Sequence, residues 1–201
     1  VVTGHDPATG KELWRAEGLN PGKARNYRIV ASPVVAGGLV IAPTRIRPMV
    51  AVKPGGRGDV TESHTAWTFD RGPDVPTPVT DGKMLYAYFG SRGVYAYDLD
   101  GNLKWKFDLP VKMAKRNGFG EGAPPTLHEN VLLLSCDHEG QSFLLALDKT
   151  TGKQLWRTER DEQSTWTPPF VVEQEGRKQI IVAGRTVRAY DFKTGELIWQ
   201  A

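Results

Sequence analysis

The 201-residue chain has only one cysteine, Cys136. A single cysteine excludes an internal disulfide and any metal site built from several cysteines. Long apolar runs are also missing: Val131–Leu134 is typical of the longest, whereas a membrane-spanning helix needs about 18 apolar residues. The sequence therefore predicts neither a disulfide-stapled domain nor a transmembrane segment.

The chain also lacks a dominant charge. It carries 26 basic and 23 acidic residues, a formal net charge of +3. The densest basic spots are small: Arg45 with Arg47, and Lys112 with Lys115 and Arg116. A nucleic-acid surface would gather such residues along one face, so we expect an ordinary solvated surface and no nucleic-acid partner.

Turn-forming residues and tryptophan are abundant. The chain has 22 glycines, 14 prolines and six tryptophans, and glycine plus proline well exceeds the usual share of about 12%. This composition disfavours a helix bundle and favours many short strands joined by tight turns. The chain starts at Val1 without a methionine, which we interpret as a processed or truncated start.

One segment recurs along the chain. It begins with a small residue and an aspartate, passes through a Thr-Gly or related turn, and ends in tryptophan. The clear copies are Gly4–Trp14, Ala96–Trp105, Ala146–Trp156 and Ala189–Trp199. A fifth copy, Ala51–Trp67, is interrupted by a swollen turn, Pro54–Thr61. Five of the six tryptophans thus mark repeat ends, which indicates a repeat architecture.

Each copy has the chemistry of a β-hairpin. Aspartate accepts backbone N–H bonds, glycine takes the positive φ of the reversal, and tryptophan anchors the return strand. Two further strand candidates precede each turn, for example Met84–Phe89 and Val131–Leu134. Four antiparallel strands per 40 to 50 residues is the pattern of a β-propeller blade. We therefore predict an all-β propeller with a half-blade at 1–14 and blades at 15–67, 68–105, 106–156 and 157–201.

The Ala-x-Asp-x-x-Thr-Gly-x-x-x-Trp pattern resembles the tryptophan-docking motif of the PQQ-repeat, quinoprotein alcohol dehydrogenase-like propellers. The resemblance implies that the tryptophan of one blade stacks on small residues of a neighbouring blade's motif, and that four to five blades here are part of a seven- or eight-bladed ring. The implied docking residues are Trp14, Trp67, Trp105, Trp156 and Trp199, with seats at Ala96, Ala146, Ala189, Gly101, Gly152 and Gly195.

The family resemblance leaves two functions open. PQQ-dependent dehydrogenases of the family hold the cofactor beneath a Cys-Cys pair, with Ca²⁺ on Glu, Asn and Asp, whereas BamB-like lipoproteins bind protein partners. Because one cysteine cannot form that pair, we expect a non-catalytic module that binds a protein or a small polar ligand, with no cofactor and no metal. The alternative is part of a PQQ-dependent oxidoreductase whose PQQ and Ca²⁺ ligands lie mostly in other blades. Either reading implies a bacterial exported or periplasmic protein.

The sequence offers two groups of candidate ligand residues. Asp137, His138 and Glu139 are metal-capable side chains in one turn, to which Glu121 or Asp161 could add; the simpler interpretation is a charged hairpin tip. The second group lies in loops that lead into inner strands and would line the mouth of the propeller: Arg116, Asn117, Glu121, Arg160, Asp161 and Trp166. Their simpler role is hydrogen bonding between blades. Cys136 is expected to be a small buried residue.

An open array leaves two blade faces uncovered. The sequence therefore also predicts contacts with remaining propeller blades or self-association through the open blade edges.

Overall fold

The computed structural model describes residues 1–25, 29–44, 49–114, 116 and 121–201. Its recurring local unit is the Asp-x-x-Thr-Gly turn. In Asp6–Gly10, Asp148–Gly152 and Asp191–Gly195, the glycine N–H donates to the aspartate carbonyl at 2.8, 2.8 and 2.9 Å. The three glycines have φ of 70°, 71° and 73°. Residues with a Cβ rarely adopt such positive values, whereas glycine does so readily. The predicted hairpin chemistry is confirmed.

Most of the chain forms four antiparallel, four-stranded sheets, in each of which consecutive strands are neighbours, and the Asp148 and Asp191 turns close the last hairpins of the third and fourth. The first contains β3 (Val34–Ala36), β4 (Leu39–Ala42), β5 (Met49–Val52) and β7 (Thr65–Phe69). The second contains β8 (Val79–Thr80), β9 (Met84–Tyr88), β10 (Val94–Asp98) and β11 (Leu103–Phe107). The third contains β12 (Thr126–His128), β13 (Val131–Cys136), β14 (Ser142–Asp148) and β15 (Gln154–Arg160). The fourth contains β16 (Phe170–Gln174), β17 (Arg177–Val182), β18 (Arg188–Asp191) and β19 (Leu197–Gln200).

The N-terminal hairpin forms a smaller sheet. β1 (Val2–His5) pairs with β2 (Glu12–Ala16), and β2 pairs in parallel with β6 (Gly58–Asp59). The swollen turn of the interrupted repeat supplies β6, and the short helix α1 (Thr61–His64) begins at its last residue. Sequence reasoning identified this swelling but not its pairing with β2, because the partner strand lies more than 40 residues away.

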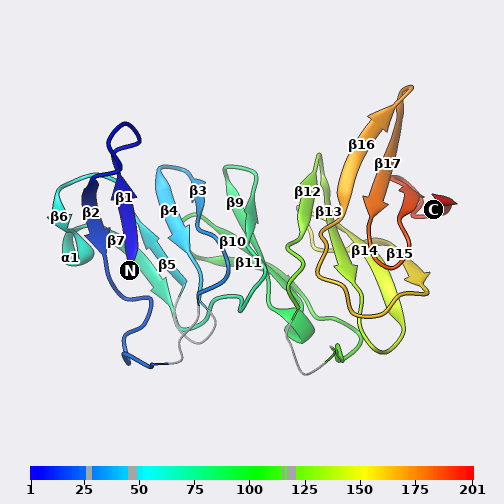
Figure 1. The fold of residues 1–201 in the computed structure, drawn as a ribbon, viewed down its shortest axis with the longest axis horizontal. Coiled ribbons are helices and arrows are strands. Elements are labelled where there is room, and N and C mark those ends of the chain that lie inside the picture. The colour runs from blue at the N-terminus through cyan, green and yellow to red at the C-terminus, as the bar shows by residue number, and fades with distance from the viewer. Residues whose placement is uncertain (26–28, 45–48, 115, 117–120) are drawn as a thin grey trace.

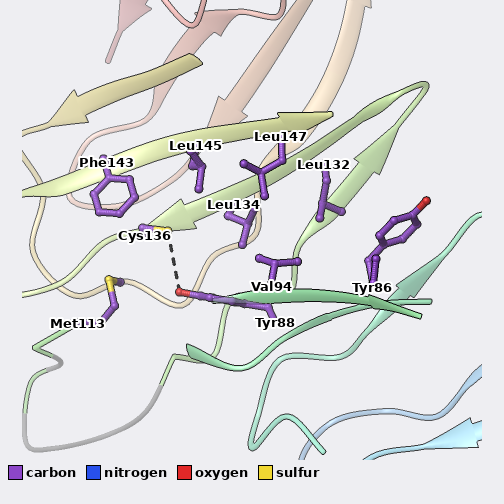
Figure 2. Close-up of a cluster of buried hydrophobic side chains, with 11 residues drawn as sticks. Tyr86, Tyr88, Val94, Met113, Leu132, Leu134, Cys136, Phe143, Leu145 and Leu147 are labelled. Carbon is purple, nitrogen blue, oxygen red and sulfur yellow. Dashed lines mark hydrogen bonds between the residues drawn. The ribbon is translucent and has the colours of Figure 1, made fainter. Parts of the chain in front are cut away.

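The sheets follow one another from the N-terminal to the C-terminal end of the molecule, and the two termini lie at opposite ends (Figure 1). Apolar side chains fill the spaces between neighbouring sheets. Figure 2 shows the cluster between the second and third sheets, where Tyr88 and Val94 face Leu134 and Leu145. Cys136 is buried there, with its Sγ 3.9 Å from the Tyr88 hydroxyl.

Helix is scarce, as predicted. The described residues contain α1 and the 3-10 turn η1 (Gly90–Arg92). Within the described part of the chain, no helix is long and apolar enough to cross a membrane.

Candidate functional site

The candidate ligand residues gather where the β11–β12, β13–β14 and β15–β16 connections meet, which we call the loop face. Its centre is an ion pair between Asp137 and Arg160, both with fully buried side chains. Arg160 Nε donates to Asp137 Oδ1 at 2.8 Å, and its NH1 donates to the Tyr190 hydroxyl at 2.7 Å. The hydroxyls of Thr165 and Ser135 also donate to Asp137 Oδ2, at 2.7 and 3.1 Å. This carboxylate is a structural acceptor inside the protein.

His138 is also buried. Its Nδ1 lies 3.3 Å from the backbone N of Ala114 and 3.2 Å from that of Gly140, while Nε2 lies 3.0 Å from the carbonyl of Gln141. Two backbone donors on Nδ1 and an acceptor at Nε2 fit the neutral tautomer with the proton on Nε2. Residues 137–139 lie in the β13–β14 connection, the place of the predicted hairpin tip, but Asp137 and His138 are buried there and Glu139 alone of the three is exposed.

A second buried pair lies next to the first. Glu162 Oε2 accepts from Arg188 NH1 at 3.1 Å, and Arg188 NH2 donates to the carbonyl of Asp161 at 3.0 Å. Burial opposes ionisation of Glu162, but hydrogen bonds from the backbone of Arg185 and Gln163 and from both arginine side chains lower its pKa below the usual value. The Ser142 hydroxyl donates to the Glu162 carbonyl at 2.7 Å and accepts from the His138 backbone N–H at 2.9 Å, which joins the β13–β14 and β15–β16 connections.

Sequence reasoning did not select Glu162, Arg188, Ser142 or Tyr190. Glu162 and Arg188 are 26 residues apart, Tyr190 and Arg160 are 30 apart, and Ser142 and Glu162 are 20 apart, so no local motif marks these contacts. The one available signal was Arg188 itself, a charge placed among apolar residues of a predicted strand. Such a position requires a buried partner.

Other predicted residues of the loop face remain open to solvent. The Asp161 side chain is almost fully exposed and Trp166 is 42% exposed. The backbone N–H of Arg116 donates to the Ser164 hydroxyl at 3.1 Å, and Glu121 Oε1 accepts from Ser91 at 3.3 Å. Asn117 lies outside the described residues. The loop face thus combines a buried polar interior with an exposed rim.

The metal-capable side chains do not converge. Among the residues that the structure describes, no group of three or more His, Cys, Asp or Glu side chains could hold a metal ion. Asp137 and His138 are held by different partners, as described above.

The repeat tryptophans contact the turns of following sheets. Trp67, Trp105 and Trp156 donate their indole N–H to the carbonyls of Leu99, Lys149 and Phe192, at 2.8, 2.9 and 3.3 Å. A Cβ placed on Gly152 would lie 2.5 Å from Cε3 of Trp105, and one on Gly195 would lie 2.5 Å from Cε3 of Trp156. A Cβ on Gly101 would lie 3.5 Å from Cδ2 of Trp67.

The repeat alanines occupy another position. Ala96, Ala146 and Ala189 pair across the hairpin with Trp105, Trp156 and Trp199 of their own sheets. Gly4 takes the same place opposite Trp14.

The two end tryptophans differ. Trp14 is buried and pairs with Gly58 of the swollen turn. Trp199 is 42% exposed, and its indole N–H donates to the side chain of Gln179 in the same sheet at 3.0 Å.

Comparisons with solved structures show the fold. BamB from Moraxella catarrhalis superposes with a TM-score of 0.68 at 19% identity, covering 98% of this chain and 56% of that one. Quinohemoprotein alcohol dehydrogenase ADHIIG from Pseudomonas putida HK5 gives a TM-score of 0.65 at 12% identity, covering 94% and 35%. The predicted β-propeller class is confirmed.

Curated relatives are similar over part of their length. Quinate/shikimate dehydrogenase (quinone) of Acinetobacter baylyi is 30% identical over 146 residues, which is 70% of this chain and 17% of that protein. Serine/threonine-protein kinase AfsK of Streptomyces griseus is 27% identical over 180 residues, 85% of this chain and 20% of that protein. The chain thus spans about a fifth of these relatives.

The sequence profile of one family matches the whole chain, residues 1–201. This match agrees with the propeller geometry, with the repeated Trp–turn contacts and with the solved structures that superpose on it. The chain belongs to the PQQ-like propeller family described as outer membrane protein assembly factor BamB.

Proposed function

We propose that this chain is a non-catalytic binding module that presents the rim of its loop face to a protein partner in the bacterial periplasm. The observation that carries the proposal is the buried polar network beneath that rim. Asp137 with Arg160, and Glu162 with Arg188, hold the loops together. Because these charged side chains pair with each other inside the protein, they hold the loops in a rigid arrangement. Recognition of a partner then falls to the exposed residues of the rim.

The rim suits a polypeptide ligand. The β15–β16 connection carries Trp166, 42% exposed, and also Asp161, whose carboxylate lies 3.8 Å from Arg185; the side chains of Asp161 and Arg185 are both more than half exposed. Tryptophan and arginine are the residues most enriched in the energetic centres of protein interfaces. The family description, an outer membrane protein assembly factor, supports the same class of partner and an exported location.

The contacts between repeat tryptophans and following turns support a scaffold. Each indole N–H bond fixes one sheet against the next, as at Trp105 and Lys149. We propose that these contacts serve as the docking of blade on blade and that the array belongs to a larger ring.

The proposal is tested with an unfolded outer-membrane β-barrel polypeptide as probe. Fluorescence anisotropy measures its affinity for the wild type, for Trp166→Ala and for Asp161→Lys. We expect each variant to weaken binding at least about fivefold, since a central interface tryptophan commonly contributes more than 1 kcal/mol. Trp199→Ala is the matched control, because Trp199 is equally exposed but belongs to another surface. Equal losses in all variants, or no binding by the wild type, would contradict the proposal.

The second candidate is part of a PQQ-dependent oxidoreductase, favoured by the 30% identity to quinate/shikimate dehydrogenase (quinone). PQQ with Ca²⁺ is titrated into the chain while tryptophan fluorescence and dye-linked alcohol oxidation are followed. Saturable quenching together with oxidation would favour this candidate. Absence of both, with binding of the polypeptide probe, would favour the binding module.

A further inference from the structure

A cavity of about 330 Å³ lies between the first and second sheets, at the end that carries the β7–β8 and β9–β10 connections. Its volume is within the range of small-molecule sites, about 300–1,000 Å³. Both walls come from residues 69–97, far from either terminus in the sequence. Aromatic and charged side chains line the cavity: Phe69, Asp70, Arg71, Phe89, Arg92, Tyr95 and Tyr97.

The aromatic rings of the lining form one continuous surface. Ring centroids are 4.9 Å apart between Phe69 and Tyr97, and 6.4 Å apart between Tyr97 and Tyr95, whose planes differ by only 13°. Phe89 meets Tyr95 edge-on at 5.0 Å. All four side chains are half-buried, so the surface that they share can be extended by a further ring stacked on it.

The equivalent position is filled by the protein's own side chains at the next two contacts between sheets. Tyr95 lies one residue before the alanine opposite a repeat tryptophan, as do Leu145 and Arg188 in the third and fourth sheets. Leu145 is buried in the apolar cluster of Figure 2. Arg188 is buried against Glu162. Beside Tyr95, by contrast, a cavity remains.

The arginines of the cavity also differ from their buried counterpart. Arg71 and Arg160 each lie four residues after a repeat tryptophan, and Arg160 is fully buried in its ion pair with Asp137. Arg71 and Arg92 are exposed, and within the described part of the chain neither side chain forms a hydrogen bond or an ion pair. Because the lining holds two arginines and one acid, Asp70, it keeps one net positive charge.

We propose that this cavity binds a small planar aromatic carboxylate. The ring of the ligand stacks on the aromatic surface, where offset or edge-on contacts at centroid distances of about 4.5–7 Å are favourable. Its carboxylate pairs with Arg71 and Arg92, since a guanidinium group presents N–H donors in a fork that matches a carboxylate. One carboxylate also balances the net charge of the lining.

Isothermal titration calorimetry with 2-naphthoate tests the site. The wild type is expected to bind one equivalent, with saturation in the millimolar range or below. Arg71→Gln and Arg92→Gln should each raise the Kd at least about tenfold, because a charge-assisted hydrogen bond is lost. Tyr95→Leu keeps an apolar side chain but removes the flat ring, and should raise the Kd at least about threefold.

Two analogues separate the two features of the ligand. 2-Naphthamide keeps the rings without the charge and is expected to bind at least about tenfold more weakly. Decahydro-2-naphthoate keeps the charge without the aromatic rings and is expected to bind at least about threefold more weakly.

Matched variants separate this site from general surface effects. Arg57→Gln removes an exposed arginine of the swollen turn, and Trp166→Ala removes an exposed aromatic ring of the loop face. Both are expected to bind 2-naphthoate like the wild type, and circular dichroism checks that every variant is folded. No saturable binding by the wild type, equal affinity for the three ligands, or unchanged affinity in Arg71→Gln and Arg92→Gln would overturn the inference. Since the binding module depends on Trp166 and this cavity on Arg71 and Arg92, the two proposals fail separately.

Discussion

At the scale of single residues, substitution within the fully buried Asp137–Arg160 pair should lower the free energy of unfolding strongly. Arg160→Met leaves a buried carboxylate without its cation, a change that typically costs about 3–5 kcal/mol. We expect urea unfolding of this variant to show a loss of that order. Arg177→Met provides the comparison, since Arg177 pairs with Asp191 but is 60% exposed, and surface pairs contribute little. Similar losses in both variants would contradict the structural role of the buried pair.

The same residues show where sequence reasoning ends. Asp137, His138 and Glu139 look alike in the sequence, as charged or polar residues around a turn, and only Glu139 is exposed. Burial of Asp137 depends on its ion pair with Arg160, which lies 23 residues further along the chain, at the end of β15. Cys136, by contrast, lies at the end of a strong apolar strand, and its predicted burial is confirmed.

At the scale of elements, the turn glycines were predictable because their role is local: Asp and Gly specify the reversal whatever surrounds them. The sheets follow from these turns and from the alternating strands. The β2–β6 pairing was not predictable, because it joins a short glycine-containing segment to a strand of another repeat.

The turns also allow the contribution of tryptophan packing to be measured. Gly152→Ala and Gly10→Ala each place a methyl at the equivalent glycine of two different turns, where φ is near 70°. Backbone strain of about 1 kcal/mol is therefore common to both. Only Gly152→Ala would also drive a Cβ to 2.5 Å from the Trp105 ring, so it is expected to lower the free energy of unfolding clearly further. Chemical unfolding at submicromolar concentration checks this, and equal losses would argue against tight packing of Trp105 on that turn.

A charge pair joins the second and third sheets and makes their contact sensitive to acid. Lys149 Nζ lies 3.0 Å from Asp81 Oδ2. Burial opposes ionisation, but the Lys149 contact and backbone N–H groups of Met84 and Lys83 outweigh it and lower the pKa of Asp81 to about 2, from 3.8. A carboxyl group whose pKa is lower in the folded than in the unfolded chain stabilises the fold at pH values above its unfolded pKa. This stabilisation is lost as the pH falls towards 2.

Asp81→Asn should therefore be less stable than the wild type at pH 7, with the difference shrinking between about pH 5 and pH 2. Thermal unfolding across that range measures it. Exposed Asp100 supplies the control as Asp100→Asn, whose difference from the wild type should vary less with pH. A difference for Asp81→Asn that stays constant down to pH 2 would show that the pair contributes no acid sensitivity.

At the scale of the whole molecule, stability should be uneven along the array because inner sheets are covered on both faces. In β13 and β14 alternate residues enter two different cores: Leu134 and Leu145 pack towards the second sheet, and Leu133 and Leu144 towards the fourth. The fourth sheet packs one face through Ile180 and leaves the other exposed. Protection from exchange follows such burial and contact density.

Hydrogen exchange of the dilute chain should accordingly be slowest in β13 and β14 and faster in β16 to β19. Mass spectrometry of peptides from 131–148 and 170–200 compares the two regions directly. Because Leu197 and Trp199 on the fourth sheet are 50% and 42% exposed, exchange should be fastest of all in 197–200. Equal protection of the two regions would mean that burial on both faces adds nothing to the stability of the third sheet over that of the fourth.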